Sequence, residues 1–105
     1  MRVLEFIVND QILTKNPSCD FSNIIPGTEG YLKARFSFSS EWDNCVLVAQ
    51  FFRGNEEHAR FIVDNECEIP PEVLKGRTFS ISILGQRANC RITTNKILIV
   101  QEVSK

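Results

Sequence analysis

The sequence predicts one all-β domain, an antiparallel, immunoglobulin-like β-sandwich of about seven or eight strands with at most one short helical turn. Three observations support this prediction. The chain has 105 residues, of which 43% are apolar and 24% charged, as in a single globular domain. Its apolar residues alternate with polar ones in several short runs, and this period of two is that of a half-buried strand. Glycine, asparagine, aspartate and proline separate these runs.

The first half of the chain contains four of the expected strands. Across 31–38 the even positions are all apolar, so one face of that strand is expected to be buried. Asn9-Asp10 suits a tight turn between the first two strands, and 16–27, with its two prolines, is expected to be a long loop. The strands expected in this half are Arg2–Val8, Gln11–Thr14, Tyr31–Phe38 and Cys45–Arg53.

The second half alternates in the same way. In 57–64, Ala59, Phe61 and Val63 are expected to face the core, whereas His58 and Arg60 are expected to face solvent. Segment 70–76 begins with proline and an acid and ends with lysine and glycine, which predicts a single helical turn. Segment 85–89 is expected to be a loop. The strands expected in this half are Glu57–Asp64, a short strand through Ile69, Arg77–Leu84, Cys90–Thr94 and Lys96–Val103.

Charge is balanced overall but divided along the chain. The net charge is −1, which argues against a dedicated nucleic-acid-binding protein, so no specific DNA binding is expected. Segment 41–72 carries eight acids and two bases, whereas 73–105 carries six bases and one acid. Such a division can align copies of the chain head to tail or hold an acidic ligand at one end. The alternative is that interleaved strands bring the two signs together, so that they cancel on the folded surface.

The four cysteines, Cys19, Cys45, Cys67 and Cys90, are widely spaced and accompany a single histidine. This spacing lacks the close ligand pairs of a structural zinc site, so no metal is expected. We interpret the cysteines as reduced thiols that pack as small apolar residues, with disulfides as the alternative for a particle exposed outside the cell. An acid at Glu5 argues against a signal peptide, and no apolar run approaches the ~20 residues of a membrane helix, so neither secretion nor a membrane partner is expected.

Few residues suggest catalysis. His58 is the only histidine, and it stands on a strand face that is expected to be solvated. The sequence contains no nucleophile elbow, cysteine-protease signature, Walker loop or dinucleotide fingerprint. We therefore expect neither an enzyme nor a bound cofactor.

Two features suggest binding sites. Arg87, Arg91 and Lys96 cluster in sequence around a predicted loop, and arginine forks match phosphate oxygens in two-point geometry. The alternative is a solvated turn with ordinary surface charge. Trp42, between two acids, is either a plug at the end of the sandwich core or an exposed aromatic anchor that contacts a partner.

Several short motifs follow one another in a defined order along the chain. They are Tyr31-Leu32 with Phe36-Ser37-Phe38, then Glu41-Trp42-Asp43, Ala49-Gln50-Phe51, Pro70-Pro71-Glu72-Val73, Phe79 to Gly85, and Arg-Ile-Thr-Thr-Asn at 91–95. Over about residues 28–100 this pattern resembles a family of small proteins encoded in phages and prophages of Gram-positive bacteria, often near tail genes. The resemblance implies a non-catalytic β-domain located in a phage particle or in the cytoplasm of the bacterial host. It implies no catalytic or ligand residues.

Three functional hypotheses remain open. The first is a tail or baseplate accessory protein that forms a homo-oligomer or binds a protein partner. The second is an anti-defence protein that sequesters a signalling nucleotide in a pocket of Arg87, Arg91 and Lys96, or that inhibits a host immunity protein. The third, an enzyme, rests on His58 and scattered acids alone.

Overall fold

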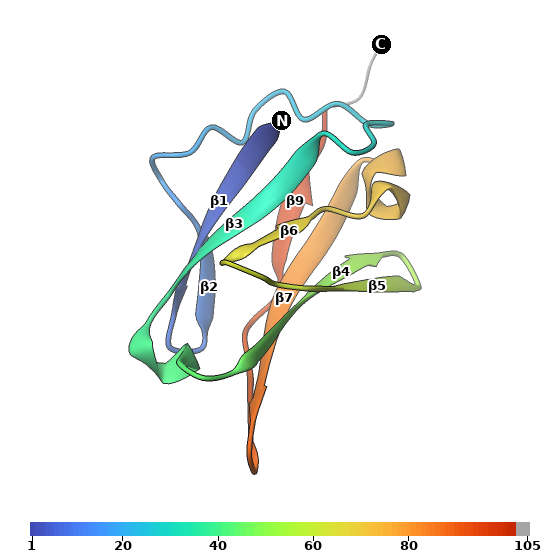
Figure 1. Ribbon diagram of the computed structural model, residues 1–105. Coiled ribbons are helices and arrows are strands. Elements are labelled where there is room, and N and C mark those ends of the chain that lie inside the picture. The colour runs from blue at the N-terminus through green and yellow to red at the C-terminus, as the bar shows by residue number, and fades with distance from the viewer. Residues whose placement is uncertain (103–105) are drawn as a thin grey trace.

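The computed structural model describes residues 1–102 and consists of two β-sheets packed face to face (Figure 1). The first sheet has the strand order β2-β1-β3-β6, and the second has the order β5-β4-β7-β8, with β9 also paired to β7. The predicted all-β sandwich is confirmed. The elements are β1 Arg2–Asn9, β2 Ile12–Lys15, β3 Leu32–Phe38, η1 Ser40–Trp42, β4 Val46–Arg53, β5 Glu56–Phe61, β6 Glu66–Glu68, η2 Pro71–Lys75, β7 Thr78–Arg87, β8 Cys90–Thr93 and β9 Ile97–Val100.

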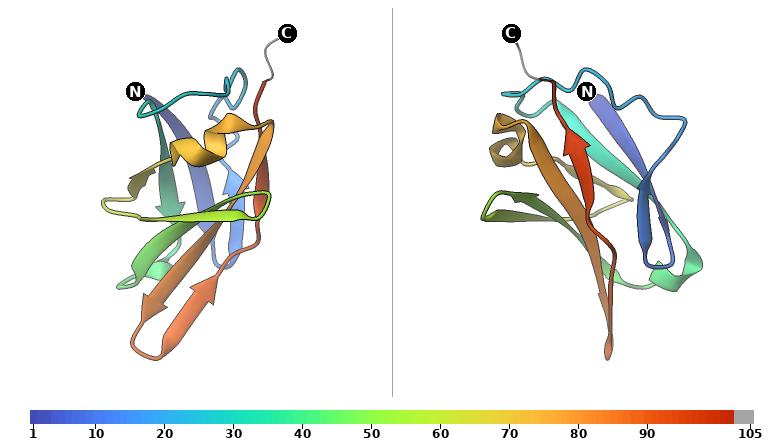
Figure 2. Two further views of the ribbon diagram at one scale, coloured as in Figure 1. Left: turned by 90° about the vertical axis from the view of Figure 1, so that its right-hand side faces the viewer. Right: turned by 180° about the vertical axis from the view of Figure 1, so that it is seen from behind.

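One strand pair departs from the antiparallel expectation. β1 and β3 run parallel, with Leu4 opposite Ala34 and Phe6 opposite Phe36. Because parallel neighbours cannot be joined by a tight turn, the chain leaves β2 and returns to β3 through segment 16–31, which passes over one end of the sandwich (Figures 1 and 2). The Arg2 guanidinium holds this segment by donating to three of its main-chain carbonyls.

The long strand β7 organises the second sheet. It pairs with β4 on one side and, on the other, with β9 along its first half and β8 along its second half. The loop expected over 85–89 is wrong, since β7 continues to Arg87 and a two-residue turn leads to β8. Within this strand position 85 requires glycine because the Trp42 ring covers it: a Cβ there would be 2.8 Å from the ring.

The core between the sheets is apolar and rich in phenylalanine. Phe6 and Phe36 stack with ring centroids 5.4 Å apart in the first sheet, and Phe51 and Phe79 lie 6.3 Å apart in the second. Two 3₁₀ turns, rather than the single helical turn expected, complete the core. η1 contributes Trp42, and η2 buries two apolar side chains of its own.

The two sides of the sandwich are closed differently. On the side of β2, the Asn95 side chain acts as a backbone mimic: its Oδ1 accepts from the Leu13 N–H at 2.7 Å and its Nδ2 donates to the Leu13 carbonyl at 3.2 Å. On the opposite side the chain crosses from β5 to β6 through a turn in which Asp64 and Asn65 both have positive φ, as a tight hairpin turn requires. β5 therefore ends the second sheet and β6 ends the first.

Candidate binding surface

The structure brings two of the three predicted basic residues to one shallow pocket of about 380 Å³. The Arg87 guanidinium is already engaged there, because it donates to the main-chain carbonyls of Glu41 at 2.6 Å and Asp43 at 3.0 Å. Arg87 thus holds the η1 turn against β7. Two acids, Asp10 and Glu41, line the same pocket as Arg91. The lining residues are Asp10, Gln11, Glu41, Arg87, Cys90, Arg91 and Ile92.

Lys96 does not line that pocket. Its Nζ lies 3.9 Å from the centroid of the Phe52 ring, which is a cation–π contact between the start of β9 and the end of β4. The cluster predicted from sequence proximity is therefore divided in the fold. Arg87 and Arg91 share one pocket, and Lys96 covers an aromatic ring elsewhere.

Trp42 is buried, with 2% of its surface exposed, so it is not an exposed anchor for a partner. Its Nε1 donates to the Asp10 carbonyl at 2.7 Å, and its ring packs 5.6 Å from that of Phe38. A buried indole N–H needs such a partner, and here the acceptor is the turn between β1 and β2. The tryptophan therefore closes one end of the core, which is the first of the two roles considered for it.

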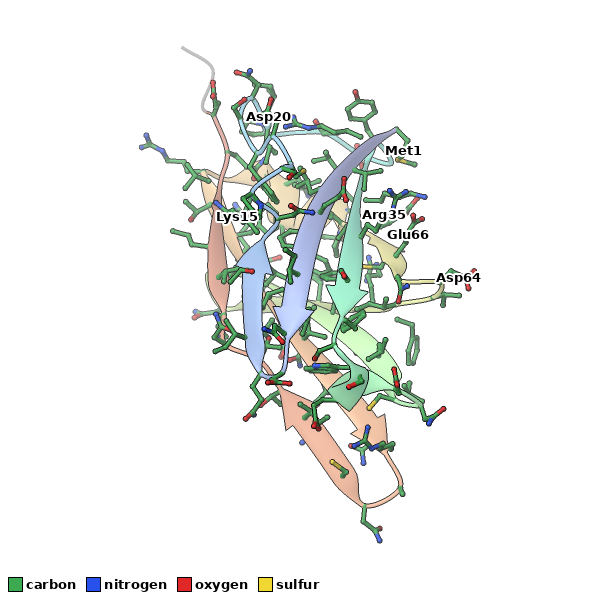
Figure 3. The ribbon with its side chains drawn as sticks, turned by 90° about the vertical axis from the view of Figure 1, so that its left-hand side faces the viewer. Met1, Lys15, Asp20, Arg35, Asp64 and Glu66 are labelled. Atoms are coloured by element: carbon green, nitrogen blue, oxygen red, sulfur yellow. The ribbon has the colours of Figure 1, made fainter. Side chains whose placement is uncertain are left out.

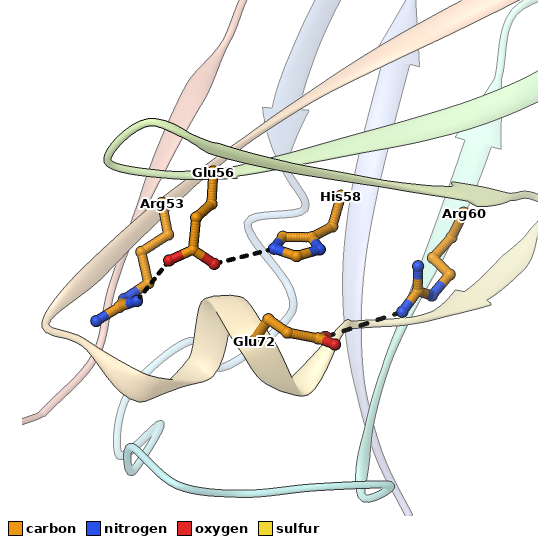
Figure 4. Close-up of polar contacts among 5 residues, drawn as sticks. All are labelled: Arg53, Glu56, His58, Arg60 and Glu72. Atoms are coloured by element: carbon orange, nitrogen blue, oxygen red, sulfur yellow. Dashed lines mark hydrogen bonds and ion pairs between the residues drawn. The ribbon is translucent and has the colours of Figure 1, made fainter.

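A polar cluster occupies the inner side of β5, facing η2 (Figure 4). Glu56 lies 3.1 Å from Arg53 Nη1 and 3.2 Å from His58 Nε2, and Arg60 lies 3.9 Å from Glu72. In the hydrogen bonds described for residues 1–102, His58 contacts Glu56 and no serine or cysteine. The cluster thus lacks the nucleophile that a histidine base would activate.

The expected orientation of β5 is wrong: the side chains expected to face the core face solvent, and those expected to face solvent face inward. His58 and Arg60 lie on the inner side, whereas Ala59 and Phe61 are exposed. The physical reason is that β5 ends its sheet, where its inner face meets the Glu72 side chain of η2 and polar side chains can be accommodated. Val63, also expected inward, is 66% exposed.

The neighbouring edge strand β6 is protected by ion pairs. Glu66 accepts from Lys33 Nζ at 3.0 Å and from Arg35 Nε at 2.8 Å, both on the adjacent β3 (Figure 3). Hydrogen bonds from Lys33 and then Arg35 lower the pKa of the Glu66 carboxyl below its ordinary value. A strand of three residues with a charged outer face is a poor template for further strand pairing.

Apolar side chains gather on the outward face of β4 and β5. Phe61 is 69% exposed and Val46 is 58% exposed. Val48 links the strands, because it stands opposite Phe61 on one side and Leu84 on the other. A shallow hollow of about 180 Å³ lies beside Phe61. We call this surface the β4–β5 patch; it consists of Val46, Val48, Ala59, Phe61 and Leu84.

The outer edge of β5 also presents backbone groups. The Ile62 N–H donates to the Leu47 carbonyl at 2.9 Å, which fixes the alternation of the antiparallel ladder. By that alternation Glu57, Ala59 and Phe61 direct their N–H and C=O groups away from β4. The Ala59 carbonyl accepts from the Arg60 guanidinium at 2.9 Å, so the strand's own side chain covers part of this edge.

Comparison of the chain with protein-family models, with curated proteins and with solved structures finds no match. Across residues 1–102, no three His, Cys, Asp or Glu side chains gather in a way that could hold a metal ion. Within the same residues, no helix is long and apolar enough to cross a membrane. The β5 edge, with the β4–β5 patch beside it, combines exposed apolar side chains with backbone groups that point away from β4.

Proposed function

We propose that this protein is a non-catalytic binding and assembly module that acts through protein–protein contacts. Its contact surface is the β4–β5 patch together with the outer edge of β5. The observation that carries the proposal is the coincidence of exposed apolar side chains with unpaired backbone on one end strand. A partner at this position would remove apolar area from water and pair the backbone groups at the same time. Assembly as a homo-oligomer is the form we propose.

The setting we propose is a phage tail or baseplate, where a module of this kind would be an accessory protein. Support comes from the resemblance of its motifs to those of the phage and prophage family. In the fold, Glu41 and Trp42 lie in the η1 turn, Asp43 follows it, and segment 91–95 includes most of β8. These motifs therefore maintain the sandwich, and the contact surface is argued separately from β5.

The mass of the chain, measured by light scattering over a concentration series, tests the proposal. We expect an oligomer that Phe61→Asp shifts to monomer, because a carboxylate in the contact would lose its hydration without gaining a partner. Ile12→Asp is the matched control, since Ile12 is 56% exposed on β2, away from the patch. A wild-type chain that stays monomeric at every concentration, or a Phe61→Asp chain that associates like wild type, would contradict the proposal.

The second candidate is the anti-defence protein that sequesters a signalling nucleotide. Its support is the pocket shared by Arg87 and Arg91, and the acids Asp10 and Glu41 in the same lining place it second. A nucleotide at 100 times its dissociation constant would add about 2.7 kcal/mol of stability. A thermal-shift screen with cyclic dinucleotides and ADP-ribose derivatives should then show a gain that Arg91→Glu removes. No gain with any nucleotide would exclude this candidate.

A further inference from the structure

We propose that β5 pairs with β5 of a second copy of this chain, antiparallel and about a two-fold axis, with His58 of one copy facing His58 of the other. This inference rests on the proposed function and names the partner at the same surface. Two-fold dimers are the commonest homo-oligomers, and their contact must be complementary to itself. The sequence of β5 meets that requirement in one register.

The edges of β6, β2 and β8 are less available than that of β5, whereas β9 also ends the second sheet and exposes Leu98 and Val100. β6 is short and ion-paired, and the β2 edge is bridged to Asn95. On the opposite side of the second sheet, the Thr93 carbonyl already accepts from the Gln11 side chain at 3.1 Å. Because Ile97–Val100 carries no charge, a contact of β9 with β9 or with β5 of a second copy would have no ion pairs along β9 to fix its register.

A two-fold axis restricts the possible registers, because the residue on the axis must face itself. Centring the pair on Arg60 sets two guanidinium groups opposite each other, and centring it on Glu57 sets two carboxylates opposite each other. Like charges in these positions are destabilising. Centring it on Phe61 would require pairing beyond the end of β5, where the chain turns toward β6.

The register centred on His58 sets Glu56 of each copy opposite Arg60 of the other, which gives two opposite-charge pairs across the contact. The register centred on Ala59 has none, since it sets His58 opposite Arg60 and Glu57 opposite Phe61. Opposite charges directly across an antiparallel pair are favourable. Charge complementarity therefore selects His58 as the central residue.

The pairing reuses groups that the isolated chain has available. Ala59 would exchange both backbone hydrogen bonds with Glu57 of the second copy, so its carbonyl would no longer need the Arg60 guanidinium. Arg60, which lies 3.9 Å from Glu72, would then reach Glu56 of the second copy. A two-fold axis perpendicular to the sheet places both β4–β5 patches on the same face of the extended sheet, and the register sets Phe61 of each copy opposite Asn55 of the other, so the second copy covers part of the Phe61 ring.

Single cysteines at the axis test the register. We would introduce His58→Cys, Ala59→Cys and Phe61→Cys separately into a Cys90→Ser background, because Cys90 is the exposed native cysteine. His58 would form a non-hydrogen-bonded pair with its symmetry mate, whose Cα atoms lie about 4.5 Å apart, within disulfide range. We expect His58→Cys to give a covalent dimer under mild oxidation well before the other two variants or the Cys90→Ser parent.

The outcomes separate this inference from the proposed function. If Ala59→Cys or Phe61→Cys forms the dimer first, the register is wrong. If no variant exceeds the parent while the wild-type mass shows an oligomer that Phe61→Asp breaks, the strand pairing is wrong and the proposed function survives. If the wild-type chain is monomeric at every concentration, both the β5 pairing and the proposed function are wrong.

A charge exchange tests the same register without cysteines. Arg60→Glu alone would set two pairs of carboxylates opposite each other, and we expect the dimer dissociation constant to rise about tenfold or more. The double variant Glu56→Arg/Arg60→Glu restores opposite charges across the contact and should recover most of that affinity. Circular dichroism checks that each variant is folded. A double variant that dimerises no better than Arg60→Glu would overturn the Glu56–Arg60 pairing.

Discussion

β5 and β6 follow one another in the chain and each ends a sheet, yet their open edges differ. β6 has three residues, and its Glu66 is held between Lys33 and Arg35. β5 has six residues, and its outward face carries Phe61 with 69% of its surface exposed. Short length and charge on β6 disfavour pairing with a further strand, whereas the longer β5 with its exposed apolar side chain permits it.

This difference indicates where the molecule makes contacts. On β6 the outer backbone groups of Glu66 already bond to Val63, and the side chains of Asn95 and Gln11 occupy backbone groups of β2 and β8. On β5 the charged side chains lie mostly inward, against η2, and the apolar ones lie outward. An open edge beside exposed apolar surface favours association, so β5 is where we expect a partner.

Removing the core beneath β5 should have the largest effect on stability. Phe51 is fully buried and stands opposite His58 in the ladder. Phe51→Ala should lower the free energy of unfolding by about 3–5 kcal/mol, because it leaves a cavity in the core of the second sheet. Urea denaturation measures this loss. A loss below about 1 kcal/mol would mean that Phe51 is not packed in the core as described.

Opening the β2 edge should have an intermediate effect on the free energy of unfolding. Asn95→Ala leaves the N–H and carbonyl of Leu13 without their side-chain partner, and we expect a loss of about 1–3 kcal/mol. Amide exchange at Leu13 should accelerate, with β5 unchanged. Unaltered exchange at Leu13 would show that Asn95 does not close this side of the sandwich.

The buried thiol of Cys67, a residue of β6, should make the free energy of unfolding fall at alkaline pH. Burial raises the pKa of Cys67 to about 12, from an ordinary value of 9.0. Because the unfolded chain ionises first, the stability that depends on the neutral thiol is complete below pH 9 and is lost as pH rises toward 12. Thermal unfolding from pH 8 to 11 should show a decline that Cys67→Ala reduces. An equal decline in both proteins would contradict this assignment.

The ion pairs on the outside of β6 should have the smallest effect. The pKa of Glu66 is lowered, so its contribution to stability is present above the ordinary carboxyl pKa and is lost as pH falls through the lowered value. Glu66→Gln should therefore be slightly less stable than wild type at pH 7, and the difference should vanish in acid. The effect is small because solvent screens exposed pairs. A difference that persists at low pH would indicate packing rather than charge.

The sequence was informative where one strand face is apolar and the other is charged. In β3, Lys33 and Arg35 alternate with apolar residues, so the buried face could be predicted. In β5 the same rule failed, because the neighbour of an end strand is set by distant segments, here η2 (Figure 4). The alternation of Ala59 and Phe61 is visible in the sequence, but which side it faces is not.

Contacts between residues far apart in the chain could not be predicted from the sequence either. Nothing near Gly85 in the chain indicates that the Trp42 ring lies over it. Arg87 reads as a free basic residue, although it donates to the carbonyls of Glu41 and Asp43. Main-chain carbonyls have no sequence signature, so a guanidinium that binds them cannot be distinguished from one that is available to a ligand.

Amide hydrogen exchange along β5, measured at increasing protein concentration, shows whether β5 is the strand through which two copies pair. In the separate chain the N–H groups of Glu57 and Ala59 point away from β4, so they should exchange rapidly at low concentration. Both should become protected as the concentration rises, while the amides of β6 keep a constant rate. Rapid exchange at Glu57 and Ala59 at every concentration, or protection that increases in β6 as well, would show that the copies do not pair through β5.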